Sequence, residues 1–451
     1  MEKIIINGSR RLNGEIEVHG SKNSALPILA ATVLANGKSV IHNCPRLSDV
    51  DAAIKILEHL GCKVEVSGHT VMVDSQNVNS FEIPDDLMRE MRSSIVFLGA
   101  ILGRMNRAVL STPGGCEIGL RPIDLHLAAM KQFGADINEE YGKLDCTAEN
   151  GLDGAKITLS FPSVGATENI MLAAATARGT TTLTNAAREP EISDLADFLN
   201  GCGAKIHGAG DSTIVIEGVK KLSGATHTVI ADRIEASTYM IAAAMTGGKI
   251  CIKEIIPAHI GALVPMLKEA GCDITISGRW LCISSPPRPK RIKTVRTMPY
   301  PGFPTDVQAP LMAMLTIADG TSVVIENIFE SRYKAASELL RLGAKISVEG
   351  RMAVIEGVPC LMGASVVAPD LRGGIALVLA GLCARGETIV TNIEHIDRGY
   401  EAPEILLQSI GADIKRTKEN DRETKEQVAA KKELTKSIFA PSSQQQGKAE
   451  F

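Results

Sequence analysis

The sequence predicts an α/β fold in which one α+β unit is repeated six times and arranged as two domains of three units. Two recurring patterns support this prediction. A small-residue helix recurs along the chain, and after each one comes Gly-(Ala/Cys)-(Lys/Asp)-(Ile/Val). This glycine pattern returns at intervals of 68 to 73 residues, at Gly61, Gly134, Gly203, Gly271, Gly343 and Gly411. A fixed period of this kind is the signature of a repeat architecture.

The glycine pattern predicts a helix-to-strand corner. It follows amphipathic runs such as 52–60 and 338–342, in which apolar residues recur at helical spacing. Glycine just beyond such a run is typical of a helix C-cap. A β-branched strand follows, as at 345–348. The same corner is therefore expected six times.

The small-residue helices give each repeat of about 70 residues its second helix. The first is followed by a glycine turn and a strand at 36–41. The predicted helices cover 24–31, 94–102, 167–177, 235–244, 307–317 and 374–383.

A third motif, Ile-x-Gly-x-x-x-Leu-x-Gly, begins at Ile6, Ile216 and Ile355. Its first copy precedes the first full repeat, so residues 1–21 are expected to be the closing strands of the last one. Six units without polar caps favour two closed sets of three. The predicted domains are 22–230, and 1–21 together with 231–416. Residues 417–451 are charged and poor in apolar side chains, which predicts a polar, disordered tail.

The amino-acid composition argues against several classes of partner and site. A net charge of −4 and 3% aromatic residues argue against nucleic acid or an anionic membrane as partner. Ten cysteines without a C-x-x-C pair indicate small core residues in a reducing compartment rather than disulfides. Nine histidines show no ligand spacing, so we expect no metal site. The expectation is a cytoplasmic protein that acts on small molecules.

Residues 113–126 predict a mobile loop, because Pro113 and two adjacent glycines disfavour a helix or strand. Cys116 lies at its tip, and Arg121 stands before a new helix. A thiol followed by a cation suggests a lid that closes over an anion. The alternative is an ordinary glycine-rich turn with a buried cysteine.

Cations also stand where the small-residue helices begin, and helix N-termini bind anions readily. We expect the cations of one domain to face those of the other, a repulsive arrangement that a polyanionic ligand would offset. The alternative is that these residues have local carboxylate partners, as Asp232-Arg233 and Asp397-Arg398 suggest. The facing cations are Lys22, Arg92 and Arg121 on one side and Arg372 and Arg398 on the other.

Asp306 follows a proline-rich segment and could be a helix cap or a base.

Taken together, the motifs resemble those of the UDP-N-acetylglucosamine 1-carboxyvinyltransferases, a family of enolpyruvyl transferases. The resemblance runs in order from residue 1 to about 416 and includes Pro-Gly-Gly-Cys-Glu-Ile-Gly-Leu-Arg-Pro-Ile-Asp-Leu-His at 113–126. The other matching motifs lie at 20–27, 91–95, 163–169, 185–192, 232–235, 303–306 and 395–401. The family's fold is a two-domain inside-out α/β barrel of six repeats.

The resemblance implies enolpyruvyl transfer from phosphoenolpyruvate to the 3-hydroxyl of UDP-N-acetylglucosamine, the first committed step of peptidoglycan synthesis. It implies no cofactor. Cys116 matches the reactive cysteine that fosfomycin alkylates, and Asp306 matches the hydroxyl base. Asp370 matches another acidic residue of the site. The implied catalytic residues are Cys116, Asp306, Lys22 and Arg398.

The resemblance also assigns the substrate contacts. Phosphoenolpyruvate would be held by Lys22, Asn23, Arg121 and Arg398. The sugar nucleotide would contact Arg92, Arg121, Pro122, Ile123, Asp124, Leu125, Ser163, Val164, Gly165, Asp306 and Ile328.

Two positions depart from the family: Ser48 and Phe161 stand where some members have lysine. Two other functions stay open at this point. One is a 3-phosphoshikimate 1-carboxyvinyltransferase-like enzyme, which shares the fold, and the other is a non-catalytic paralogue that keeps the binding residues.

Overall fold

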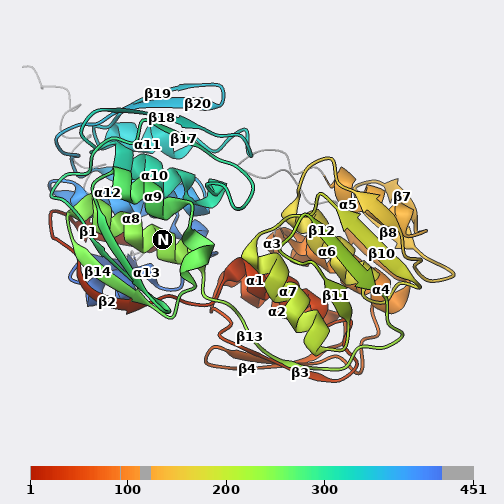
Figure 1. The fold of residues 1–451 in the computed structure, drawn as a ribbon. Coiled ribbons are helices and arrows are strands. Elements are labelled where there is room, and N and C mark those ends of the chain that lie inside the picture. The colour runs from red at the N-terminus through yellow and green to blue at the C-terminus, as the bar shows by residue number, and fades with distance from the viewer. Residues whose placement is uncertain (1, 92, 112–122, 419–451) are drawn as a thin grey trace, which may run out of the picture.

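The buried apolar side chains form two separate cores. The computed structural model describes residues 2–91, 93–111 and 123–418. One core is built from residues between Ala25 and Val229. The other combines residues between Ile4 and Val18 with residues between Ile234 and Ile414. Figure 1 shows two corresponding lobes, which we call the first and the second lobe.

The first lobe contains the elements from α1 to β13. In chain order they are α1 (Lys22–Ala31), β3 (Lys38–His42), α2 (Ser48–His59), β4 (Lys63–Ser67), β5 (Thr70–Asp74), α3 (Asp85–Glu90), η1 (Ser94–Val96), α4 (Phe97–Met105), β6 (Arg107–Ser111), α5 (Asp124–Gln132), β7 (Asp136–Glu140), β8 (Lys143–Thr147), β9 (Lys156–Thr158), α6 (Val164–Ala174), β10 (Thr180–Thr184), α7 (Pro190–Gly201), β11 (Lys205–His207), β12 (Thr213–Glu217) and β13 (Thr226–Thr228).

The second lobe contains the first two strands and everything after β13. These elements are β1 (Glu2–Asn7), β2 (Asn13–Glu17), α8 (Arg233–Thr246), β14 (Lys249–Lys253), η2 (Pro257–Ile260), α9 (Leu263–Glu269), β15 (Asp273–Ser277), β16 (Trp280–Ser284), β17 (Thr294–Arg296), η3 (Thr305–Val307), α10 (Gln308–Leu315), β18 (Thr321–Ile325), α11 (Ala335–Arg341), β19 (Lys345–Glu349), β20 (Met352–Glu356), β21 (Ser365–Val367), α12 (Leu371–Cys383), β22 (Glu387–Thr391), η4 (Ile393–His395), α13 (Pro403–Ser409) and β23 (Asp413–Lys418).

Helices lie inside each lobe and sheets cover them (Figure 1). In the second lobe α8, α10 and α12 pack on one another, and in the first lobe α4 packs on α1 and α6. Nearly every residue of α12 is buried, as expected for a helix that is apolar on all sides. The described residues form six sheets, with strand orders β13-β3-β5-β4, β6-β8-β7 and β11-β12-β10-β9 in the first lobe and β15-β16-β14-β2, β17-β18-β20-β19 and β21-β22-β1-β23 in the second.

The six repeated glycines adopt the conformation that the sequence predicts. Each has a φ between 86° and 102°, in the left-handed region that a C-cap glycine favours, which confirms the helix-to-strand corners. Helix bounds differ by a few residues from the prediction. α2 begins at Ser48 rather than at residue 52, because Asp49 and Asp51 in its first turn favour a helix N-terminus. The run 307–317 divides into η3 and the shorter α10.

Two chain segments connect the lobes and lie side by side. Gly20 and Ala231 form an antiparallel bridge between them. The N–H of Ser21 donates to the carbonyl of Ile230 at 2.7 Å, and the N–H of Asp232 donates to the carbonyl of His19 at 2.8 Å. We call residues 18–21 and 230–232 the two links.

The N-terminal strands complete sheets of the second lobe. β1 lies between β22 and β23, and β2 pairs with β14. β23 continues to Lys418, where it pairs with Glu2, so two residues of the predicted tail belong to a strand. The rest of the predicted tail, residues 419–451, lies outside the described residues.

The prediction of reduced cysteines is wrong for one pair. A disulfide joins Cys251 on β14 to Cys282 on β16. The two residues are direct partners in an antiparallel ladder, which brings their side chains within bonding reach. This register is not visible in the spacing of the cysteines. Cys62, Cys202 and Cys272 are free and buried, as expected for small core residues.

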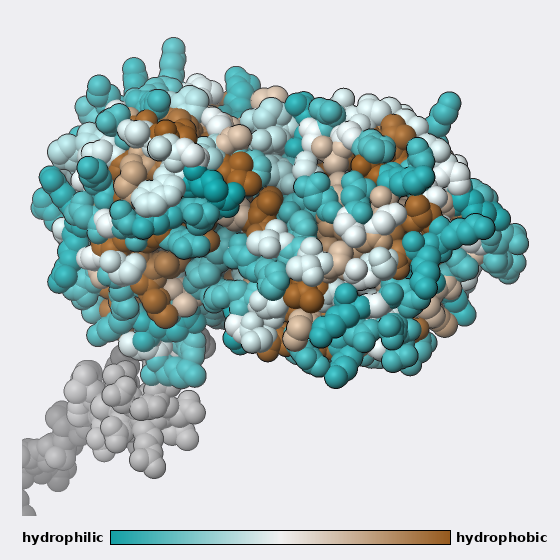
Figure 2. All heavy atoms as spheres, turned by 60° about the horizontal axis from the view of Figure 1, so that its bottom comes forward, coloured by the Kyte–Doolittle hydropathy of each residue, from teal (hydrophilic) through white to brown (hydrophobic). Residues whose placement is uncertain are grey.

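The surface is mixed in character. On the face in Figure 2, hydrophilic residues cover most of the rim, and hydrophobic residues form several separate patches rather than one. Among the helices of the described residues, none is both long enough and apolar enough to cross a bilayer.

Candidate active site

Asp306 accepts hydrogen bonds from two buried arginines. Its Oδ1 lies 2.8 Å from a terminal nitrogen of Arg332 and 3.1 Å from Nε of Arg372. Both guanidinium side chains are 4% exposed, whereas that of Asp306 is 30% exposed. Asp306 lies within η3, whose N-cap is Pro304, and makes no cap hydrogen bond. The helix-cap alternative is therefore wrong, and the carboxylate is held by ion pairs.

The two arginines keep Asp306 ionised. Burial alone raises the pKa of this carboxyl, but the positive charges of Arg372 and Arg332 outweigh burial and hold the pKa well below its usual range. Arg372 itself lies at the start of α12, where Asp370 caps the helix by accepting from the N–H groups of Arg372 and Gly373. The helix start thereby fixes the backbone from which Arg372 reaches Asp306.

Asp49 forms a second centre of the same kind. Its Oδ2 accepts from Nζ of Lys22 at 3.1 Å, and its Oδ1 accepts from Nε of Arg398 at 2.9 Å. A second nitrogen of Arg398 lies 3.3 Å from Oδ2, so this ion pair is bidentate. The side chain of Asp49 is only 2% exposed. Lys22 and Asp49 belong to the first lobe and Arg398 to the second, so this centre spans both.

The two centres act on each other electrostatically. Burial lowers the pKa of Lys22, and the positive charges of Arg372 and Arg398 lower it further. The negative charge of Asp49 raises this pKa but does not outweigh them. Lys22 also contributes to the low pKa of Asp306. With all groups ionised, four cations face two carboxylates, and Asp232, whose charge also acts on Arg372, reduces the local excess to one positive charge. The site is therefore suited to a polyanion. Its members are Lys22, Asp49, Asp306, Arg332, Arg372 and Arg398.

The helix-end arginines do have carboxylate partners, as the alternative holds, but the partners are not the sequence neighbours that suggested it. Arg233 pairs with Glu191 of the first lobe at 3.0 Å and Arg398 pairs with Asp49, whereas Asp232 caps α8. Asp397 pairs instead with Arg416. The expected repulsion between facing cations is also offset within the protein, because the carboxylate of Asp49 lies between Lys22 and Arg398.

A second group of predicted contacts gathers around His126. Ser163 accepts from the N–H of Ala166 at 3.3 Å and so caps α6. A side chain at Gly165 would approach the His126 ring to 3.1 Å, so this glycine permits close packing. His126 follows Ile123, Asp124 and Leu125 at the start of α5, so the segments 123–125 and 163–165 lie next to each other.

Two more predicted residues lie beside the carboxylate centres. Asn23 follows Lys22 in the first turn of α1. The N–H of Ile328 donates to Glu326 at 2.8 Å, and Thr305, the neighbour of Asp306, donates to the same carboxylate. The remaining predicted residues, Arg92, Cys116, Arg121 and Pro122, lie outside the described residues.

Sequence reasoning missed Asp49 and Arg332. In the sequence, Asp49 is explained as an acidic side chain that stabilises the N-terminus of a helix. No residue near it in sequence indicates an ion pair with residue 398. Arg332 precedes α11 without a motif. A signal for Asp49 does exist, because a buried carboxylate requires a cationic partner, but burial at that position cannot be read from a helix N-terminus.

Comparisons with known proteins agree with this fold. The family model described as EPSP synthase (3-phosphoshikimate 1-carboxyvinyltransferase) matches residues 6–407. The chain is 56% identical to UDP-N-acetylglucosamine 1-carboxyvinyltransferase 2 of Caldanaerobacter subterraneus subsp. tengcongensis, over 92% of this chain and all of the relative. It is 50% identical to UDP-N-acetylglucosamine 1-carboxyvinyltransferase 1 of Symbiobacterium thermophilum, over 92% of this chain and 95% of the relative.

Solved structures show the same architecture. The enolpyruvyl transferase NikO from Streptomyces tendae superposes with a TM-score of 0.83 at 27% identity, covering 93% of this chain and 99% of that one. EPSP synthase from Acinetobacter baumannii superposes with a TM-score of 0.72 at 20% identity, covering 93% of this chain and all of that one. The latter likeness concerns the fold alone.

Proposed function

Because the chain belongs to the EPSP synthase family, we propose that it transfers the enolpyruvyl group of phosphoenolpyruvate to the 3-hydroxyl of UDP-N-acetylglucosamine and releases phosphate. The observation that carries this proposal is the 56% identity to a relative of that name, over the relative's whole length. The reaction would open peptidoglycan synthesis in the cytoplasm, without a cofactor.

The cation excess described above supports the proposal. Phosphoenolpyruvate carries a carboxylate and a phosphate, and the sugar nucleotide carries a diphosphate. We propose that Lys22, Asn23, Arg121 and Arg398 hold phosphoenolpyruvate. For the sugar nucleotide we propose Arg92, the segments 121–125 and 163–165, Asp306 and Ile328. Fixed cations at a dry site stabilise developing negative charge more than water does.

The proposed chemistry is addition followed by elimination. Asp306 takes the proton of the 3-hydroxyl, whose oxygen bonds to the central carbon of phosphoenolpyruvate. Cys116 donates a proton to the methylene carbon, which gives a tetrahedral adduct. In the second step a proton leaves the new methyl group, phosphate departs and the vinyl ether forms. No electrons are gained or lost overall.

The pKa of Asp306 must rise before this carboxylate can act as a base. Its ion pairs with Arg332 and Arg372 keep it ionised, but they also make its oxygen a poor proton acceptor. An anionic substrate that draws either guanidinium toward itself would raise the pKa of Asp306. Binding of the substrate would thus activate the base.

We also propose that the two lobes are two domains, residues 22–230 and residues 1–21 with 231–416, each an inside-out α/β barrel of three repeats. The two separate cores and the three sheets in each lobe support this division. The sheets cover the helices, which is the reverse of a barrel with helices outside.

The family description favours one other candidate, a 3-phosphoshikimate 1-carboxyvinyltransferase. Phosphate release with phosphoenolpyruvate separates the two. We expect release with UDP-N-acetylglucosamine and none with 3-phosphoshikimate. Release with 3-phosphoshikimate alone would reverse the assignment, and no release with either acceptor would identify a non-catalytic paralogue.

A further inference from the structure

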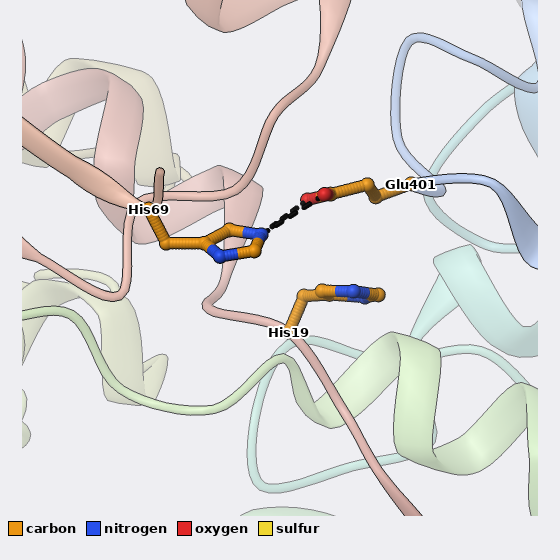
Figure 3. Close-up of side chains that lie close together, drawn as sticks. All are labelled: His19, His69 and Glu401. Atoms are coloured by element: carbon orange, nitrogen blue, oxygen red, sulfur yellow. Dashed lines mark hydrogen bonds and ion pairs between the residues drawn. The ribbon is translucent and has the colours of Figure 1, made fainter. Parts of the chain in front are cut away.

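Two histidines and a glutamate meet where the lobes join (Figure 3). His19 lies in the first link, between β2 and α1. His69 lies in the turn between β4 and β5 of the first lobe, and Glu401 precedes α13 of the second. One potential ligand atom from each lies within 4.8 Å of the others. None of these residues has a part in the proposed reaction.

The glutamate lies close to one ring nitrogen. Nε2 of His69 is 2.9 Å from Oε1 and 3.1 Å from Oε2 of Glu401, nearly equidistant from the two oxygens. The His19 and His69 rings have centroids 5.8 Å apart. Two nitrogens and a carboxylate thus converge from three separate parts of the chain.

A buried carboxylate orients His19. Glu235 of α8 lies 3.1 Å from Nδ1 of His19 through Oε1, and its Oε2 accepts the backbone N–H of the same residue at 2.8 Å. The side chain of Glu235 is almost fully buried. Donation from Nδ1–H to Glu235 places the ring's lone pair on Nε2. A carboxylate that fixes the tautomer in this way is typical of histidines that bind metal.

We propose that His19, His69 and Glu401 bind a divalent transition-metal ion of the zinc, nickel and cobalt class, with water completing the coordination. Two imidazoles and one carboxylate form an established ligand set for zinc. Magnesium and calcium prefer oxygen ligands, so this donor set disfavours them. His69 is 48% exposed, which leaves an open side for the ion and its water.

The geometry requires only a modest adjustment. Tetrahedral ligands at bond lengths of about 2.0–2.1 Å lie roughly 3.3 Å apart. The His69–Glu401 separation is already near that value, and the remaining separations are at most 4.8 Å. Side-chain rotations of His69, which is 48% exposed, and of Glu401, which is 20% exposed, can close such a gap without a change in the backbone.

The site would connect both lobes and a link through one ion. Glu401 also accepts the backbone N–H of Arg46 at 2.8 Å and lies three residues after Arg398, the cation that reaches Asp49. A bound ion would therefore hold the lobes in the arrangement in which Arg398 and Asp49 form their ion pair.

The test is metal titration of the full chain, prepared without a polyhistidine tag and with its accessible thiols alkylated. At about pH 8, above the ordinary imidazole pKa of about 6.5, calorimetry with Zn²⁺ and the visible spectrum of Co²⁺ report binding. We expect one ion per chain. His69→Gln should weaken binding at least about 100-fold, and Glu235→Gln about 10- to 100-fold through loss of the tautomer control.

The matched control is His59→Gln, at the exposed end of α2, which should bind the ion like the parent chain. Circular dichroism checks that every variant is folded. The proposal is overturned if the parent chain binds no Zn²⁺ at about 100 μM, which would leave an ordinary His69–Glu401 hydrogen bond. It is also overturned if His69→Gln binds as tightly as the parent, or if His59→Gln loses binding equally.

Discussion

The Asp306 and Asp49 centres share one chemistry but differ in where their partners come from. Each is a carboxylate held by two cations. Both cations of Asp306 belong to the second lobe, so that centre is complete within one core. Asp49 takes Lys22 from its own lobe and Arg398 from the other. The first centre is therefore preorganised, whereas the second exists only where the lobes meet.

This difference separates two roles. A base must be held in one geometry throughout the reaction, which a single core provides. An ion pair across two cores instead links substrate binding to the arrangement of the lobes, because an anion that competes for Lys22 or Arg398 also changes the contact between lobes. Arg233 and Glu191 form a second ion pair of this inter-lobe kind.

The largest expected effect is that of Asp306→Asn. Turnover should fall by about 10² or more, the usual scale for loss of a general base, while nucleotide binding survives. Two buried guanidiniums would lose their carboxylate, so the free energy of unfolding should fall by about 3 kcal/mol. Phosphate-release kinetics and denaturant titration measure these effects.

Asp319→Asn is the matched control for Asp306→Asn, because Asp319 is an exposed aspartate of the same lobe. It should leave both turnover and stability unchanged. Turnover of Asp306→Asn within about threefold of the parent would remove Asp306 from the role of base.

Asp49→Asn tests the inter-lobe centre. It leaves Lys22 and Arg398 facing each other without a carboxylate, so the lobes should separate and the radius of gyration in small-angle scattering should increase. Turnover should fall roughly tenfold, which corresponds to about 1.4 kcal/mol. UDP-N-acetylglucosamine should restore the compact profile. Asp51→Asn, an exposed neighbour on α2, is the control. An unchanged scattering profile for Asp49→Asn would contradict this role.

Thiol labelling sharpens the prediction for Cys116. Burial raises the pKa of the Cys44, Cys62, Cys146 and Cys202 thiols to about 12, so these are poor nucleophiles at neutral pH. Iodoacetamide or an epoxide should react with Cys116 at least about tenfold faster than with any other free cysteine. Peptide mapping after brief labelling measures this, with Cys116→Ser as control. Comparable labelling of the half-buried Cys360 would contradict the prediction.

The last prediction concerns the dependence of stability on acid, to which the buried His126 contributes together with His259, whose pKa burial also lowers to about 4. Burial lowers the pKa of His126 to about 4, and Asn169 donates to its Nδ1 at 2.8 Å, which requires the neutral ring. The unfolded chain takes up this proton at about pH 6.5, so the free energy of unfolding should decline from there toward pH 4, by up to about 3 kcal/mol.

The carboxylate centres behave differently in acid. The pKa values of Asp49 and Asp306 are lowered, although burial alone would raise them, because their cationic partners outweigh burial. Their stabilisation is therefore present above the ordinary carboxyl pKa and is lost only as the pH falls through the lowered folded values. His126→Asn should make the decline between pH 6.5 and 4 shallower, with the contribution of His259 remaining. An unchanged slope in denaturant titrations of this variant would assign the decline to other groups.

Much of the local structure could be predicted from the sequence. The six glycine corners depend on residues next to each other, and all six glycines have the expected φ. The convergence of Lys22, Arg372 and Arg398 followed from equivalent positions in the repeats. The ion-pair partners Asp49 and Arg332 could not be predicted in this way, because they acquire their roles only through packing between distant segments. The Cys251–Cys282 disulfide and the His19–His69–Glu401 cluster were missed for the same reason.

The position of β1 and β2 also has a consequence for synthesis on the ribosome. β1 pairs with β22, so that Ile4 lies opposite Val390, and both partners of β1 are translated last. The first lobe, by contrast, lies wholly between the two links and can fold while the second is still being made. β1 must therefore stay unpaired for most of translation, whereas β2 lacks its partner β14 only until somewhat more than half of the chain has been made. Ribosome-arrested chains that end near residue 260 should contain a protease-resistant first lobe and a cleavable N-terminus.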